Sequence, residues 1–145
     1  MRWPAAVLAA GLLAALGWAA LAPIRFASRE ERFVIPHGTF ARRMAGENAP
    51  ILPDEIHLTL GLRDVLLLHN RDEVPQIFGP TLMMPGQSFR LPFAQASSYQ
   101  FACTAHASGQ MTVIVEPEPT TAWARLRWRA GALWRRWQRV DESAE

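Results

Sequence analysis

The stretch Cys103–Thr–Ala–His106–Ala–Ser–Gly–Gln–Met111 places the only cysteine of the chain, an imidazole and a thioether within nine residues. These ligand types together suit copper, and a trigonal His/Cys set with a weak axial Met is the electron-transfer arrangement. Tyr99, Phe101 and Cys103 are expected to point the same way on one strand, and a second alternating strand begins at Met111. The stretch therefore predicts two neighbouring strands that bring candidate metal ligands Cys103, His106 and Met111 into one pocket.

Short segments in which apolar and polar residues alternate surround this stretch, and turns separate them. Such alternation is typical of half-buried strands, and several short strands at close spacing predict an all-β sandwich. No convincing helical stripe interrupts residues 32–116, and residues 78–84 are expected to be irregular. The predicted strands are Arg32–Ile35, Ile56–Leu60, Val65–Leu68, Ser88–Phe93 and the segments that begin at Tyr99 and Met111.

Composition excludes several classes of protein. One cysteine in 145 residues rules out an intramolecular disulfide and any cysteine-rich zinc or iron–sulfur site. All 15 basic residues are arginine, and six of them lie between Arg125 and Arg139. The central part of the chain is therefore near neutral, which argues against nucleic-acid binding by this part. No nucleophile–base set or phosphate-binding loop is present, which argues against an enzyme. We expect solvated turn positions for the acidic residues Asp54, Glu55, Asp64, Asp72 and Glu73.

Residues 1–24 are predicted to be a membrane anchor or a signal segment. Pro4 to Ile24 carries no charge and is long enough to cross a bilayer as a helix. Ala20–Leu–Ala22 resembles a signal-peptidase site, but Pro23 would hinder cleavage, so we favour an uncleaved transmembrane helix. By the positive-inside rule, the arginines after the segment would place the following domain on the cytoplasmic side. We nevertheless expect the domain on the extracytoplasmic side of the cell membrane, because the copper ligands and the signal-like run agree.

The carboxyl-terminal part is predicted to be a Pro-rich linker, residues 117–122, followed by an amphipathic helix, residues 123–140. Apolar side chains recur at helical spacing, and arginines fill much of the rest of the wheel. Tryptophan and arginine together are typical of a membrane-surface helix. A helix packed on its own domain or on a partner is the alternative. The pattern consists of Trp123, Leu126, Ala130, Leu133, Trp134 and Trp137 with Arg125, Arg129, Arg135, Arg136 and Arg139.

The region from Phe33 to Glu116 resembles the cupredoxin family, in particular its plastocyanin-like branch. The resemblance implies a two-sheet Greek-key β-sandwich or barrel with one copper ion near one end. It further implies that Cys103 is the thiolate ligand, His106 an imidazole ligand and Met111 the axial thioether, and that Asn70 steadies the site by hydrogen bonding. The matching segments are Val34–Ile–Pro–His–Gly–Thr39, Val65–Leu–Leu–Leu–His–Asn70, Met84–Pro–Gly–Gln–Ser–Phe89, Tyr99–Gln–Phe–Ala–Cys103 and the loop from Cys103 to Met111.

The sequence departs from the family pattern at one ligand. The family has a second histidine ligand shortly after the asparagine, and alignment of Asn70–Arg–Asp–Glu–Val–Pro75 puts Gln76 there. An amide oxygen is a neutral, hard donor and a weak substitute for imidazole on copper. His69 lies seven residues earlier, and the odd offset directs it to the other face of a strand. Met83 and Met84 could add a thioether, or they fill apolar space.

Three hypotheses follow for the altered site. In the first, Cys103, His106 and Met111 bind Cu(I), with Gln76 or water completing the shell, because Cu(I) accepts low coordination and soft sulfur. In the second, the domain is a working electron carrier despite Gln76. In the third, it is a metal-free interaction module in which Cys103 is a buried small hydrophobe. We expect a membrane-tethered copper protein for electron transfer or copper delivery, with the membrane and a redox partner or copper-receiving membrane protein as partners.

Overall fold

The computed structural model describes residues 3–47, 51–106 and 108–142, and the side chains of residues 6–47, 51–106 and 108–134. The chain divides into two compact units. Residues Phe26–Glu118 form one, which we call the sandwich unit, and Met1–Arg25 with Pro119–Glu145 form the other, the helical unit.

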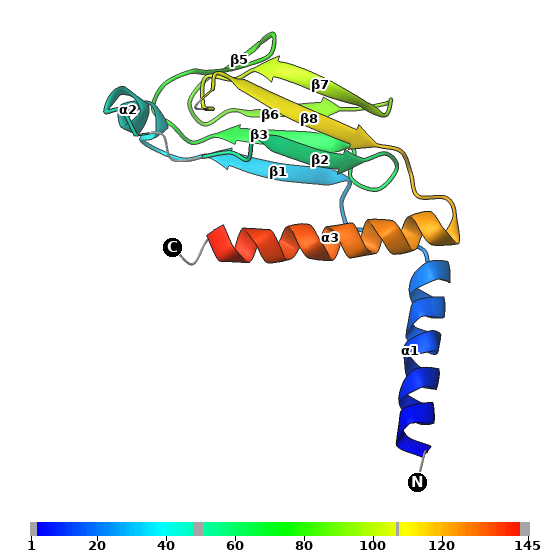
Figure 1. The fold of residues 1–145 in the computed structure, drawn as a ribbon. Coiled ribbons are helices and arrows are strands. Elements are labelled where there is room, and N and C mark those ends of the chain that lie inside the picture. The colour runs from blue at the N-terminus through cyan, green and yellow to red at the C-terminus, as the bar shows by residue number, and fades with distance from the viewer. Residues whose placement is uncertain (1–2, 48–50, 107, 143–145) are drawn as a thin grey trace. The chain divides into compact units, whose positions relative to one another are not determined.

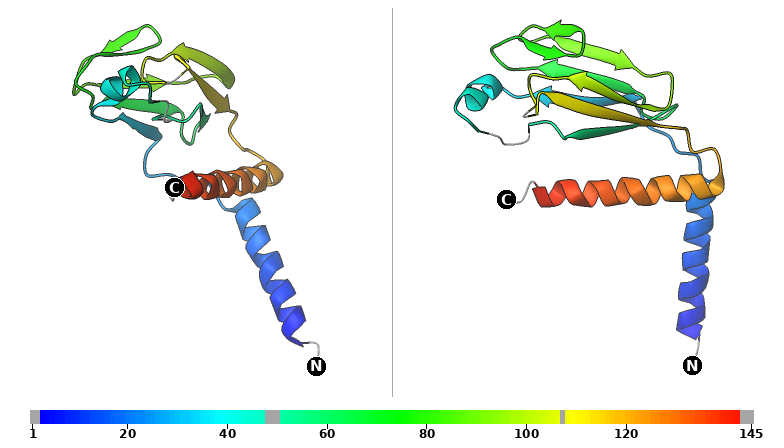
Figure 2. Two further views of the ribbon diagram at one scale, coloured as in Figure 1. Left: turned by 60° about the vertical axis from the view of Figure 1, so that its left-hand side comes forward. Right: turned by 45° about the horizontal axis from the view of Figure 1, so that its top comes forward.

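The sandwich unit is built from two mixed three-stranded sheets and a hairpin (Figures 1 and 2). In each sheet the first strand pairs in parallel with the central one and the third pairs antiparallel with it. This arrangement confirms the predicted β-sandwich. The first sheet has the order β1 (Glu30–Ile35), β3 (Val65–Asn70) and β6 (Ser88–Pro92), the second β2 (Glu55–Thr59), β8 (Gln110–Glu116) and β7 (Ser97–Ala102), and the hairpin comprises β4 (Gln76–Phe78) and β5 (Thr81–Met83).

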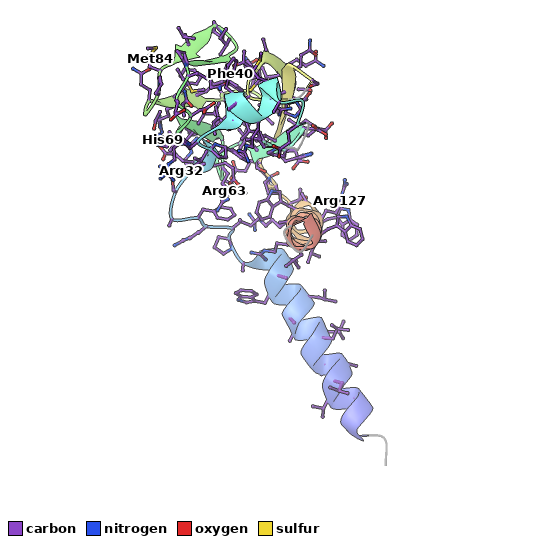
Figure 3. The ribbon with its side chains drawn as sticks, turned by 90° about the vertical axis from the view of Figure 1, so that its left-hand side faces the viewer. Arg32, Phe40, Arg63, His69, Met84 and Arg127 are labelled. Atoms are coloured by element: carbon purple, nitrogen blue, oxygen red, sulfur yellow. The ribbon has the colours of Figure 1, made fainter. Side chains whose placement is uncertain are left out.

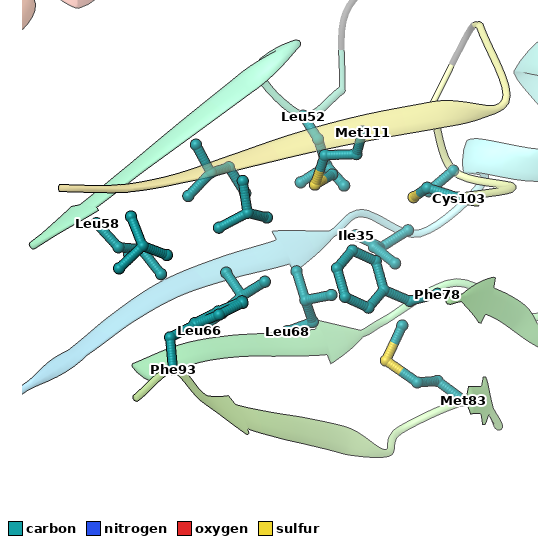
Figure 4. Close-up of a cluster of buried hydrophobic side chains, with 14 residues drawn as sticks. Ile35, Leu52, Leu58, Leu66, Leu68, Phe78, Met83, Phe93, Cys103 and Met111 are labelled. Atoms are coloured by element: carbon teal, nitrogen blue, oxygen red, sulfur yellow. The ribbon is translucent and has the colours of Figure 1, made fainter. Parts of the chain in front are cut away.

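The core lies between the two sheets, where the inward side chains of alternating strands meet (Figure 4). Met111, Val113 and Val115 on β8 are buried, and the residues between them are partly exposed. This period of two is the pattern that the sequence predicted for the strand. The cluster also contains Cys103, so the candidate thiolate belongs to the apolar core.

Two elements of the sandwich unit differ from expectation. Residues 78–84, expected to be irregular, contain the turn and the second strand of the β4–β5 hairpin, in which Gln76 pairs with Met83. Gly79 makes the turn at φ 54°, and a Cβ there would come within 2.9 Å of the Phe101 ring, so only glycine fits without a shift. A short helix, α2 (Thr39–Met44), also lies where no helical stripe was seen, because its amino end is held by a distant carboxylate rather than by its own sequence.

The helical unit contains α1 (Trp3–Leu21) and α3 (Ala122–Glu142). The sequence predicted a transmembrane helix through Ile24, but α1 stops at Leu21 because Pro23 disfavours helical backbone in the residue before it. Among the residues that the structure describes, no helix combines the length and the apolar character needed to cross a membrane. The predicted transmembrane helix is therefore corrected to a helix of 19 residues.

The predicted amphipathic carboxyl-terminal helix is present as α3, and two of its arginines contact α1. Arg129 donates to the carbonyls of Ala19 and Ala22, and Arg125 donates to that of Leu21 at 3.2 Å. The last carbonyls of a helix lack intrahelical donors and carry partial negative charge, so these arginines act as a cap supplied from another element. The side chains of Arg135, Arg136, Trp137 and Arg139 lie outside the described residues.

A buried carboxylate, Asp64, pairs with the exposed Arg29 side chain, at a position expected to be solvated. Asp64 is buried, accepts from both Arg29 nitrogens that face it, and accepts from the Gly61 amide at 2.9 Å. The hydrogen bond from Arg29 lowers the pKa of Asp64 below its ordinary value of 3.8, with a smaller contribution from the Gly61 amide, although burial acts in the opposite direction. The expectation of a solvated turn residue at this position was wrong.

We expect acid to destabilise the sandwich unit through Asp64. Because this pKa is lower in the folded than in the unfolded chain, the carboxylate contributes stability that is fully present above its unfolded pKa. That contribution is lost as pH falls below the ordinary pKa of 3.8 and through the lower folded pKa. Urea unfolding of Asp64→Asn against pH should show a shallower loss over this range than the parent, whereas Glu55→Gln, at an exposed position, should keep the parent slope. Equal slopes in all three proteins would contradict the assignment.

Candidate metal centre

Cys103 and Met111 face the same buried cluster. β7 and β8 are antiparallel with Phe101 opposite Met111, and the Cys103 amide donates to the Gly109 carbonyl at 2.9 Å. Residues two apart on a strand share a face, so Cys103 has the same face as Phe101 and Met111. Diagonal neighbours of this kind have Cα atoms about 7–8 Å apart, within reach of long side chains. Figure 4 shows both sulfur-bearing side chains in the core cluster.

The surroundings of Cys103 act in both directions on its thiol, and the net effect favours the protonated form in the metal-free chain. Burial raises its pKa, while hydrogen bonds from the Ala105 and His106 amides and the nearby Arg43 charge act in the opposite direction. Thiols bind metal as thiolates, so binding at Cys103 releases a proton. The two amide donors would then stabilise the sulfur charge.

His106 stands in a tight turn that leads from Cys103 to Gly109. The His106 amide donates to the Cys103 carbonyl at 3.2 Å, and the Gly109 amide donates to the His106 carbonyl at 3.1 Å. The ring is buried, with Nε2 2.7 Å from Oδ1 of Asp54 and Nδ1 2.9 Å from the Ser108 hydroxyl oxygen. The imidazole is therefore held on one side by Ser108 of the loop and on the other by Asp54, which directly precedes β2.

Gln76 lies beside the cysteine loop, but its amide is already engaged. The side chain is 2% exposed, donates from Nε2 to Asp72 at 3.0 Å, and accepts at Oε1 from the Thr104 hydroxyl at 2.7 Å. β4 is joined to the same loop because Ile77 donates to the Thr104 hydroxyl and accepts from the Thr104 amide. Both polar groups of the Gln76 side chain are thus bound within the protein.

Asp72 organises this end of the sandwich, although it was expected to be solvated. It is 3% exposed and accepts from the Gly38 and Phe40 amides at the start of α2, from the Glu73 amide, and from Gln76. Burial raises its pKa, but these hydrogen bonds outweigh burial and leave the pKa below its ordinary value. The Asp72 amide also donates to Asn70 Oδ1 at 2.9 Å, an Asx turn that fixes the backbone at this position.

We expect Asp72→Ala to be strongly destabilising. The change leaves the Gly38 and Phe40 amides and the Gln76 amide group without their acceptor, and unsatisfied buried donors together lower the free energy of unfolding by about 3 kcal/mol. Chemical denaturation measures this difference. Glu73→Ala removes the adjacent exposed carboxylate and should change the free energy by less than about 0.5 kcal/mol. Similar losses for the two variants would refute the role assigned to Asp72.

The remaining sequence candidates fall into two groups. Asn70 is buried and donates to the Val74 and Met83 carbonyls at 3.0 Å, which fixes the loop that leads to Gln76. Met83 belongs to the same apolar cluster as Cys103, and Figure 4 draws the Phe78 ring between these two side chains. Met84 is exposed, and His69 bonds the Ser88 hydroxyl at the sheet surface, so both lie at the periphery (Figure 3).

Arg43 is a neighbour of the site that sequence reasoning missed. It lies on α2 and donates from Nη2 to the Ala105 carbonyl at 2.9 Å. Its Nε and Nη1 atoms are buried and have no hydrogen-bond partner among the described residues. A cation beside the loop favours the thiolate form of Cys103, in line with its effect on that thiol's pKa.

The donors suit soft copper and do not complete a four-ligand blue-copper set. Within the described parts of the chain, no three or more His, Cys, Asp or Glu side chains gather where they could hold a metal ion. What remains is one thiol, one imidazole and one thioether, Cys103, His106 and Met111. Two sulfur donors and one nitrogen fit Cu(I), which accepts low coordination, better than Cu(II).

Two mixed sheets, a buried cysteine directly after β7 and a histidine loop that leads to Met111 on β8 define a cupredoxin-like β-sandwich. The chain is similar to a purple cupredoxin from Nitrosopumilus maritimus at 17% identity and TM-score 0.45, covering 59% of this chain and 98% of that one. It is similar to an amicyanin variant in the Cu(I) form at 20% identity and TM-score 0.43, covering 68% and 89%. A second amicyanin variant, in the oxidized state, has 21% identity, TM-score 0.43 and the same coverage. No family model and no curated protein matches the chain.

Proposed function

We propose that the sandwich unit binds one Cu(I) ion through Cys103, His106 and Met111 and acts in copper delivery or electron transfer. One observation carries this proposal: Gln76 has both ends of its amide bound to Asp72 and Thr104, while Cys103 and Met111 share a buried face. A site with two sulfurs, one imidazole and no second imidazole favours the reduced ion. Bound copper would supply an electron or be passed on.

The residues of this chain would do the remaining work. The Ala105 and His106 amides would hold the Cys103 sulfur as an anion, and the Arg43 charge would favour the same form. The apolar cluster around Met111 would exclude water and keep oxygen donors from the ion. Because the loop is joined to β4 and α2 by hydrogen bonds, the donors would move little on loading.

Titration of the full chain with Cu(I) under a competing chelator tests the proposal. We expect one equivalent to be taken up by the parent and by His69→Gln, because His69 lies on the sheet surface. His106→Gln removes the only nitrogen donor of the proposed set and should lose stoichiometric uptake. Absence of uptake in the parent would refute the proposal, as would equal uptake by the His106 and His69 variants.

We propose further that the helical unit holds the protein at the extracytoplasmic face of the cell membrane. Several large apolar side chains of α1 are exposed, as are Trp123, Leu133 and Trp134 on α3. Exposed apolar surface of this kind favours lipid, and tryptophan favours the headgroup zone. The α1 residues concerned are Val7, Leu8, Leu12, Leu13, Leu16, Trp18 and Leu21.

Flotation with anionic vesicles measures this association. We expect the parent to float and Leu8→Ser/Leu12→Ser to bind at least about tenfold more weakly, because two leucines lose their transfer from water. Leu82→Ser removes an exposed leucine of the sandwich unit and should float like the parent. A parent that stays with the soluble fraction would contradict membrane association. Protease accessibility in intact cells tests the side of the membrane.

A metal-free interaction module is the second candidate. It is favoured by the state of the proposed ligands in the metal-free chain. Nδ1 of His106 contacts Ser108, and burial raises the pKa of the Cys103 thiol. In that case Cys103 fills space in the core. The Cu(I) titration separates the two candidates, because only the module leaves the chelator unchanged.

A further inference from the structure

Asp54 contacts the one nitrogen ligand of the proposed site, from outside the loop. Its Oδ1 lies 2.7 Å from Nε2 of His106. The His106 side chain is 6% exposed and that of Asp54 85%, so the carboxylate stands between a buried ring nitrogen and solvent. Neither the cysteine loop nor the sequence pattern indicated this contact.

The position of Asp54 is fixed by the sheet that carries Met111. Asp54 directly precedes β2, which pairs in parallel with β8, and its carbonyl accepts from the Thr112 amide at 3.2 Å. Thr112 follows Met111 in the chain. The backbone of Asp54 is therefore bound to the strand that holds one proposed ligand, while its side chain reaches another.

The partners of His106 determine which ring nitrogen carries the proton. A carboxylate only accepts hydrogen bonds, so Nε2 donates to Asp54. A backbone amide only donates, and the Ser108 amide lies 3.3 Å from Nδ1, so Nδ1 accepts. The Asp54 contact places a proton on Nε2, and the Ser108 amide contact leaves the free electron pair of the neutral ring on Nδ1, while the Ser108 hydroxyl donates to the Gln110 carbonyl at 3.0 Å.

We propose that Asp54 is a positioning residue for His106, which holds the ring in the Nε2–H tautomer and presents Nδ1 to copper. This inference rests on the proposed function for its consequence, since His106 is the only nitrogen donor of the set. Histidine ligands commonly donate their second ring N–H to a carboxylate, which fixes ring orientation and raises ligand basicity. Nδ1 would give up its Ser108 contact to act as a ligand, while Nε2 would keep its contact to Asp54.

The test compares Asp54→Ala, Asp54→Asn and Glu55→Gln with the parent as full chains. Asn keeps a carbonyl oxygen that accepts from Nε2, Ala removes it, and Glu55→Gln removes the neighbouring carboxylate, which faces His57 instead. Long-range ¹⁵N–¹H spectra of the metal-free proteins at constant pH report the tautomer of His106. Competition with a chelator reports Cu(I) affinity of the same samples.

We expect the Nε2–H tautomer in the parent, in Asp54→Asn and in Glu55→Gln, and a mixture of tautomers in Asp54→Ala. Affinity for Cu(I) should fall about tenfold in Asp54→Ala and stay near the parent value in the other two. Urea unfolding should be unchanged in Asp54→Asn and Glu55→Gln, because those side chains are exposed, whereas Asp54→Ala also loses the acceptor of the buried His106 ring.

A parent-like tautomer in Asp54→Ala would overturn the inference. Parent-like Cu(I) affinity in Asp54→Ala would overturn it equally, even with an altered tautomer. If the parent takes up no Cu(I), the copper proposal fails by itself, and the tautomer spectra still decide whether Asp54 positions the ring. The two failures are therefore distinguishable.

Discussion

Replacement of Cys103 by serine should abolish stoichiometric Cu(I) uptake, the largest effect that we expect for the site. The thiolate is the only anionic donor of the set, and Cu(I) binds a hydroxyl far more weakly than a thiolate. The loop that presents Cys103 does not depend on the sulfur, since its backbone is held by Gly109 and Ile77 through their carbonyls. Chelator competition on the purified full chain measures the loss.

The size of the effect should follow donor type across a series. Cys103→Ser should lose most, His106→Gln next, and Met111→Leu least, because a weak thioether is replaced by an isosteric apolar side chain at a buried position. Met83→Leu is the matched control, a buried methionine of the same cluster that is outside the proposed set. Equal losses for Met83→Leu and Met111→Leu would show that the series reports core packing rather than ligation.

Gln76→His should create an intense visible absorption band when Cu(II) is added, whereas the parent should stay without one. The change supplies a second imidazole and completes a trigonal His/Cys set with an axial methionine, the arrangement of blue-copper sites. Histidine also keeps an N–H that can donate to Asp72 in place of the Gln76 amide group. Absorption and electron paramagnetic resonance spectra on Cu(II) addition measure the outcome.

Thr104 provides the control for this experiment, since its hydroxyl competes for the second ring nitrogen of the introduced histidine. Gln76→His/Thr104→Val should show the band at least as strongly as the single variant. Gln76→Asn is the matched amide and should remain colourless. A colourless Gln76→His protein that takes up no copper would mean that Cys103, His106 and Met111 do not face a common pocket.

The parts of the fold that local pattern determines could be predicted. The strands around Tyr99 and Met111 alternate with a period of two, and this alone placed Cys103 and Met111 on one face. The spacing of the cysteine loop likewise led to the prediction of His106 as a ligand, which stays a prediction. The end of α1 at Leu21 was missed because the apolar run continues to Ile24, although Pro23 carried the signal.

The parts that depend on distant contacts could not be predicted. Asp72 was taken for a solvated residue because its partners, the amides at the start of α2, lie far away in the chain. Arg43 and Asp54 reach the cysteine loop through α2 and β2, and no motif connects them to it. The engagement of Gln76 by Thr104 also joins residues from separate segments. The charge and spacing of such residues can be read from the sequence, but their hydrogen-bond partners in other segments cannot.

X-ray absorption at the copper edge of the Cu(I)-loaded full chain tests the central claim most directly. The account predicts a low-coordinate ion with two sulfur neighbours and one imidazole nitrogen. In Met111→Leu, one of the two sulfur neighbours should be lost. Gln76→Ala should leave the spectrum unchanged, because both ends of that amide are bound elsewhere. An ion surrounded by nitrogen and oxygen alone, or a spectrum that changes with Gln76 and not with Met111, would contradict it.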